Sequence, residues 1–293
     1  MVRTLSFFIF LSFLAACGSG TLTEPSGTIT SEQASSFTSS YASQLEGTAS
    51  IDASGAKTFV QTGAQSNSRR HLLSLAGIST TASAPREDAA CSGTVSGDST
   101  DADSDEINLN QTTTFDCSYT TSFGTGNLSG SFAIVDKDDA AVFPLGGGTI
   151  TVSDLTNQVN FGEAVIGISV NGSFDATAAT STISTTNNFK TTVSAANQEA
   201  SVTYQMGSTA TPTDMDSPLA GGTVTFSGFI QIEGGDQDFT LQVTATDVTY
   251  GGCSRDDFKL NTGTVTLVDG SSNTITFTYE NCTRTAAYNG NSL

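Results

Sequence analysis

Apolar and polar residues alternate strictly in the last third of the chain. In residues 239–246 and 274–279 every second residue is apolar, and the residues between them are threonine or glutamine. A period of two places the apolar side chains on one face of a strand and the hydroxyl and amide groups on the other. These segments therefore predict β-strands with one buried and one polar face.

Similar segments extend back towards the middle of the chain, without helical patterns between them. This succession predicts an antiparallel sheet with up-and-down connections. We expect residues 207–218 to interrupt the series, because they contain two prolines and two aspartates. The other expected strands are residues 91–96, 107–121, 128–135, 142–152, 159–174, 182–193, 200–206 and 222–232.

One helix is expected near the N-terminus, over residues 30–45. Thr30 and Gln33 have the spacing of a capping box. Apolar residues then follow at helical spacing, and we expect this face to pack on the sheet. Residues 49–62 predict a strand or hairpin, and residues 63–90 predict a loop with a short helix at residues 68–76. The helical face consists of Ala34, Phe37, Tyr41 and Leu45.

The expected fold class is mainly β: an antiparallel up-and-down sheet, either curled into a half-barrel or folded as a sandwich, with the N-terminal helix packed on it. A curled sheet with a helix resembles the half-barrels of periplasmic lipoprotein carriers and lipid-binding lipoproteins. That resemblance implies a cavity for a lipid or other apolar ligand. In this chain the expected lining is Phe226, Phe239, Leu241 and Phe277.

The first sixteen residues have the layout of a secretory signal peptide. Arg3 precedes an apolar run over residues 5–14, which is too short to span a bilayer as a helix. The sequence Leu14-Ala15-Ala16-Cys17 follows, and it resembles the lipobox of bacterial lipoproteins. The resemblance implies cleavage before Cys17, a diacylglyceryl group on its thiol and attachment to a membrane.

The same resemblance divides the chain and suggests its location. Residues 1–16 would be the signal peptide, residues 17–29 the lipidated N-terminus and a flexible tether, and residues 30–293 a single β-rich domain with a sub-boundary near residues 207–218. Gly18, rather than aspartate, follows Cys17. In a Gram-negative bacterium this resembles the pattern of lipoproteins sent to the outer membrane.

The charge balance argues against nucleic acid as a partner. The formal net charge is -19, and the few basic residues are scattered, with one adjacent pair at Arg69-Arg70. Binding to a polyanion needs clustered lysine and arginine. A docking patch for an acidic partner at Arg69, Arg70 and His71 is the less favoured interpretation of that pair; a solvated turn is the preferred one.

Four cysteines besides Cys17 agree with export. They can pair in three ways. We expect the sequential pairs Cys91–Cys117 and Cys253–Cys282, because each pair would join neighbouring strands. A zinc site is disfavoured, since no Cys-x-x-Cys spacing is present and the single histidine is distant.

An acidic run offers one candidate metal site. Asp101, Asp103 and Asp105 stand at alternate positions, as at the start of an EF-hand loop. The pattern then departs from an EF-hand, because Glu106 stands where glycine belongs and Thr112 where the bidentate glutamate belongs. Two interpretations stay open: a looser Ca²⁺ site, and a solvated acidic hairpin tip. No other cofactor is expected.

The sequence lacks the parts of a nucleophilic active site. It has no Gly-x-Ser-x-Gly motif and one histidine, His71. We therefore expect a non-catalytic, lipid-anchored cell-envelope protein with a binding or structural role, whose partner is an envelope protein or an apolar ligand. The alternatives are a carrier of a lipid or other apolar ligand and, third, an exported hydrolase.

Overall fold

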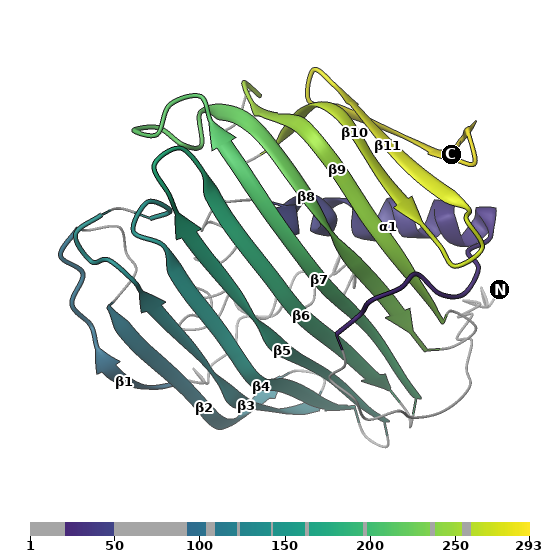
Figure 1. Ribbon diagram of the computed structural model, residues 1–293. Helices are drawn as coiled ribbons and strands as arrows, with labels where there is room; N and C mark the ends of the chain where they lie inside the picture. Colours follow the sequence, from purple (N-terminus) through teal and green to yellow (C-terminus); the bar gives the residue numbers. More distant parts are fainter. Residues whose placement is uncertain are drawn as a thin grey trace.

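A single antiparallel sheet with one helix forms the described part of the molecule (Figure 1). The computed structural model describes residues 21–49, 93–103, 109–121, 124–141, 143–161, 164–195, 198–234, 238–253 and 259–293. Within these ranges the elements are α1 (Ser31–Ala49), β1 (Thr94–Asp98), β2 (Asn110–Thr121), β3 (Gly124–Asp136), β4 (Gly148–Phe161), β5 (Ala164–Ala178), β6 (Ile183–Ala195), β7 (Gln198–Pro212), β8 (Gly221–Glu233), β9 (Phe239–Gly251), β10 (Leu260–Val268), β11 (Thr274–Glu280), β12 (Thr283–Tyr288) and β13 (Asn291–Ser292).

The sheet is open and its strands follow one another in chain order, from β1 at one edge to β13 at the other. Each strand pairs antiparallel with the next, which confirms the predicted up-and-down topology. In the described residues the sheet is single and twisted, and helix α1 packs on its apolar face (Figure 1). Ala49 ends α1, and the rest of the strand or hairpin predicted over residues 49–62 lies outside the described residues. So do the loop and short helix predicted within residues 63–90, with Arg69, Arg70 and His71.

Three predicted strand boundaries are wrong. The strand expected over residues 142–152 begins only at Gly148, after a turn and bend at residues 143–146. Gly207–Pro212 does not interrupt the series but continues β7, and Pro212 pairs with Gly222 at the end of that strand. A proline is tolerated there because it is the last residue of the strand. The apolar segment 159–174 is two strands, with β4 ending at Phe161 and β5 beginning at Ala164. Apolar residues continue on both sides of this connection, so the pattern does not reveal it.

Helix α1 begins with the predicted capping box. The Gln33 amide donates to the Thr30 hydroxyl over 3.2 Å, and the Thr30 amide donates to Gln33 Oε1 over 2.8 Å. Phe37 and Leu45 of the helix are 2% and 1% exposed and belong to the same core as the apolar residues of β6–β11. Near the end of the helix, Glu46 Oε1 accepts from the Tyr279 hydroxyl over 3.1 Å and pairs with Arg284. The helix thus covers one face of the last strands.

The covered face of the sheet contains two apolar clusters. The first joins α1 to β6–β11, and the second lies on β2–β5 around Phe115, Phe132 and Phe174. Buried polar residues lie between them on part of β6 and β7. The Thr185 and Ser208 hydroxyls share a buried hydrogen bond of 2.6 Å, and Asn187 is also buried. We call Thr185, Asn187 and Ser208 the polar seam.

Residues 21–29 form a strap that crosses the opposite face of the sheet before the chain reaches α1 (Figure 1). The Leu22 amide donates to Gln205 Oε1 on β7. Ser26 exchanges two backbone hydrogen bonds with Thr240 of β9, at the end of that strand where β10 no longer pairs with it. Gly27 has a φ of 69°, and a Cβ there would lie 2.4 Å from the Asp238 carbonyl oxygen. The prediction of a flexible tether over residues 17–29 is therefore wrong for residues 22–29, which are bonded to the sheet.

Candidate functional site

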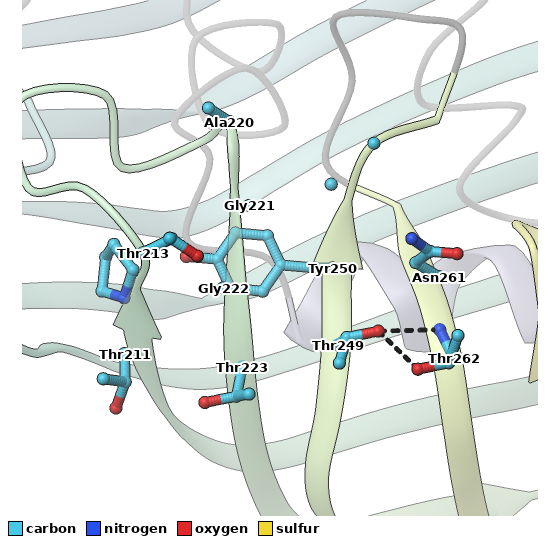
Figure 2. Close-up of a pocket in the computed structure, with 13 residues that line it drawn as sticks. Thr211, Thr213, Ala220, Gly221, Gly222, Thr223, Thr249, Tyr250, Asn261 and Thr262 are labelled. Carbon is cyan, nitrogen blue, oxygen red and sulfur yellow. Dashed lines mark hydrogen bonds between the residues drawn. The ribbon is translucent and has the colours of Figure 1, made fainter.

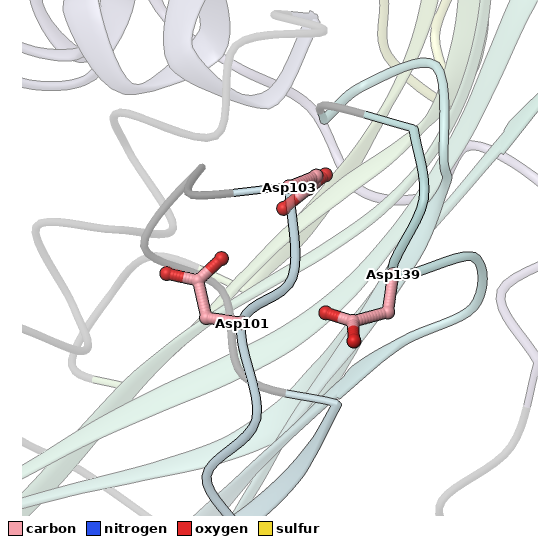
Figure 3. A group of neighbouring side chains, drawn as sticks. All are labelled: Asp101, Asp103 and Asp139. Carbon is pink, nitrogen blue, oxygen red and sulfur yellow. The ribbon is translucent and has the colours of Figure 1, made fainter.

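Three carboxylates converge beside the β1–β2 and β3–β4 connections (Figure 3). One oxygen from each of Asp101, Asp103 and Asp139 lies within 4.8 Å of the others. The Ala102 amide donates to Asp139 Oδ1 over 2.9 Å, which fixes the two connections to each other. Asp98 ends β1 nearby, and hydrogen bonds from the Thr100 hydroxyl and amide lower the pKa of its carboxyl.

The cluster agrees in part with the expected metal ligands. Asp101 and Asp103 are brought together as the alternate spacing suggested, whereas Asp105 lies outside the described residues. Asp139 was missed, because it is 36 residues from Asp103 in the sequence and only the pairing of β2 with β3 brings it near. Oxygen ligands in this arrangement suit a hard cation such as Ca²⁺. Carboxylates also gather on any surface this acidic, so the Ca²⁺ site stays a prediction.

A shallow polar groove lies at one end of strands β7–β10 (Figure 2). A row of threonines crosses it, because Thr211 pairs with Thr223, Thr223 with Thr249, and Thr249 with Thr262. The Thr249 and Thr262 hydroxyls share a hydrogen bond of 2.6 Å. Sequence reasoning missed this row, since threonine is frequent throughout the chain and only the strand register brings these four together.

The groove offers hydrogen bonds rather than acid–base chemistry. Among the described residues that line it there is no acid, lysine, arginine, histidine or cysteine. Tyr250 lies over the space left by Gly222, and its hydroxyl donates to the Pro218 carbonyl over 2.9 Å. Burial raises the pKa of Tyr250 to about 12, so its hydroxyl stays protonated at neutral pH. The groove suits a neutral polar group.

The expected lining of an apolar ligand cavity is part of the close-packed core. Phe226, Phe239, Leu241 and Phe277 are 1%, 3%, 0% and 0% exposed and belong to one cluster that includes helix α1. A cavity with room for an acyl chain would leave these side chains accessible to a water-sized probe. The four residues therefore fill the core instead of lining a ligand cavity.

The disulfides follow the predicted pattern as far as they are described. Cys253, just after β9, is bonded to Cys282 between β11 and β12, which confirms that pair. Cys117 on β2 is also disulfide-bonded. Its predicted partner, Cys91, lies outside the described residues, so the pair Cys91–Cys117 stays a prediction.

Cys17 and the whole of residues 1–16 lie outside the described residues. In the part that is described, no helix combines the length and apolar character needed to cross a membrane. Comparisons with protein-family models, with curated proteins and with solved structures found no match for this chain. The molecule is therefore assigned by its fold alone: over the described residues it is an open, antiparallel up-and-down sheet with one helix.

Proposed function

We propose that this chain is a lipid-anchored protein of the bacterial cell envelope with a non-catalytic binding or structural role. The observation that carries the proposal is the sequence Leu14-Ala15-Ala16-Cys17 placed directly after a short apolar run. A diacylglyceryl group supplies two acyl chains, and about two are needed for stable attachment to a membrane.

Two features of the fold support export and anchoring. Disulfides persist in oxidising compartments outside the cytoplasm, and Cys253–Cys282 is such a bond. The strap also fixes residues 22–29 to the sheet, so a lipid on Cys17 would hold the folded body itself and not a long free tail.

The experiment is the substitution Cys17→Ser in the full chain expressed in a bacterium. Acylation is measured by mass spectrometry of the mature N-terminus, and attachment by flotation of membranes in a density gradient. We expect the variant to carry no acyl group and to be lost from the membrane fraction, whereas the neighbouring control Ser19→Ala keeps both. Unchanged membrane attachment of Cys17→Ser would refute the lipid anchor.

The proposal extends to the outer membrane if the organism is Gram-negative, since Gly18 follows Cys17. The substitution Gly18→Asp should then shift the acylated protein from the outer to the inner membrane fraction. Acylation itself should not change, which separates sorting from anchoring. An unchanged distribution of Gly18→Asp would refute the sorting part alone.

The binding role is best supported at the groove of β7–β10. Its row of hydroxyls and its lack of charge suit a neutral, hydrogen-bonding ligand or partner surface. The carrier alternative has less support, because its four expected lining residues fill the core. An exported hydrolase has no support from the groove, since the part of its lining that the structure describes holds no acid–base pair.

A further inference from the structure

The strap fixes the place from which an N-terminal anchor leaves the folded body. Leu22 is held at Gln205 on the face of the sheet opposite α1, which we call the open face. Gln205 lies at the middle of β7, seven residues from each end of that strand, and β7 has six strands on each side. A chain that continues from Leu22 towards Cys17 therefore leaves near the centre of the open face.

The length of chain before this point is short. Four residues lie between Cys17 and Leu22, and the five residue-to-residue steps span at most about 18 Å when fully extended. From Gln205 to either end of β7 is about 23 Å, and to either outer strand about 29 Å, at the usual rise and strand spacing. If the sheet stood on its strand ends or on an outer strand, Leu22 would be too far from the bilayer for Cys17 to reach it.

A row of uncharged residues crosses the open face at this point, although the whole chain is strongly acidic. The cross-strand row through Gln205 is uncharged from β1 to β10. Beside the row, Lys190 pairs with Glu233 and Lys137 pairs with Asp175, while Glu24 of the strap and Asp247 of β9 are exposed acids on this face. The row consists of Ser96, Thr112, Ala133, Thr151, Ser173, Asn188, Gln205, Phe229, Gln242 and Val268.

We propose that the open face lies against the membrane surface, held there by the short link between the lipidated Cys17 and the strap. Hydroxyl and amide side chains of this face would meet the headgroup layer, and α1 would point away from the bilayer. The inference rests on the proposed lipid anchor. It adds the orientation of the molecule and the surface that meets the lipid.

The test uses the absence of tryptophan from the chain. Thr151→Trp places one fluorophore on the open face, and Ser36→Trp places one at an exposed position of α1 on the other side of the sheet. Each full-length, acylated variant is reconstituted in phosphatidylcholine vesicles that contain a lipid with a nitroxide on its headgroup. We expect quenching of Thr151→Trp and no quenching of Ser36→Trp.

A third variant tests the link. About twenty Gly/Ser residues inserted after Gly20 would give the link a root-mean-square span of about 25–30 Å, enough to release the body. In this background the difference between the two tryptophans should be lost. Persistence of the difference would overturn the link as its cause.

The outcomes separate the orientation from the anchor. Mass spectrometry and vesicle flotation report acylation independently of fluorescence. An acylated protein in which both tryptophans are quenched equally, or Ser36→Trp more strongly, overturns the orientation alone. A chain that is not acylated overturns the proposed function, and the orientation with it.

Discussion

Asp269 is the residue that ties the strap to the end of the sheet. Its buried carboxylate accepts hydrogen bonds of 2.8 Å from the amides of Ile29, Ser271 and Asn273, and another from the Asn273 side chain. Burial opposes ionisation, but these four donors outweigh it, so the pKa of Asp269 lies below its ordinary value. A carboxylate with a lowered pKa stabilises the folded state above its unfolded pKa, and this contribution is lost as the pH falls through the folded value.

Asp269→Asn should therefore lower the free energy of unfolding at pH 7 by about 1–3 kcal/mol, since the amide group turns a donor towards buried donors. The difference from the parent should shrink as the pH falls below about 4, where the unfolded chain takes up the proton, and on through the lower folded pKa of Asp269. Urea denaturation at several pH values measures both effects. The exposed Asp116→Asn is the control, and an equal loss in both variants would contradict the role of Asp269.

The hydroxyl pair in the polar seam allows a second test at single residues. Thr185→Val leaves the buried Ser208 hydroxyl without its partner, and we expect a loss of about 1–3 kcal/mol in unfolding free energy. The double variant Thr185→Val/Ser208→Ala removes both hydroxyls and should recover most of that loss. Denaturant midpoints of the two single variants and the double variant measure the coupling. Simple additivity would show that the hydrogen bond contributes nothing.

At the scale of elements, the sequence predicts those features that leave a local pattern. The capping box of α1, the period-two strands and the Asp269-Gly270 turn between β10 and β11 all follow from nearby residues. The strap leaves no such pattern, because its bonds are to residues some 180 to 240 positions away. Asp139 and the threonine row of the groove were missed for the same reason: strand register, not local sequence, brings their residues together.

The contact between α1 and the last strands can be measured through Glu46. Its carboxylate accepts from the Tyr279 hydroxyl and pairs with Arg284, whose guanidinium lies 5.6 Å from the centre of the Phe277 ring. Burial, and after it the Glu46 carboxylate, raise the pKa of Tyr279, so its hydroxyl stays a donor at neutral pH. The three side chains form one contact between helix and sheet.

Glu46→Ala and Arg284→Ala should each lower the free energy of unfolding, and the double variant should lose less than the sum. We expect a coupling of about 0.5–3 kcal/mol, as for residues in direct contact. A double-mutant cycle by urea denaturation measures it. Glu280→Ala, an exposed glutamate at the end of β11, should change the stability little; a coupling near zero would mean that this ion pair does not hold the helix.

For the whole molecule, the important fact is that one continuous sheet carries two separate apolar clusters. Backbone pairing connects β1 to β13 without a break, whereas on the covered face the polar seam lies between the β2–β5 cluster and the cluster under α1 over part of β6 and β7. Local opening depends on how many buried apolar contacts a region has. The two halves should therefore differ in their response to a lost core side chain, although they share one sheet.

Native-state hydrogen exchange tests this separation with two matched substitutions. Phe115 and Phe277 are fully buried, one in each cluster, and truncation of either to alanine costs about 3–5 kcal/mol. We expect Phe115→Ala to speed amide exchange in β2–β5 far more than in β8–β11, and Phe277→Ala to do the reverse. Each variant is the control for the other. Equal acceleration across all strands would mean that the sheet opens only as one unit and that the seam does not divide the molecule.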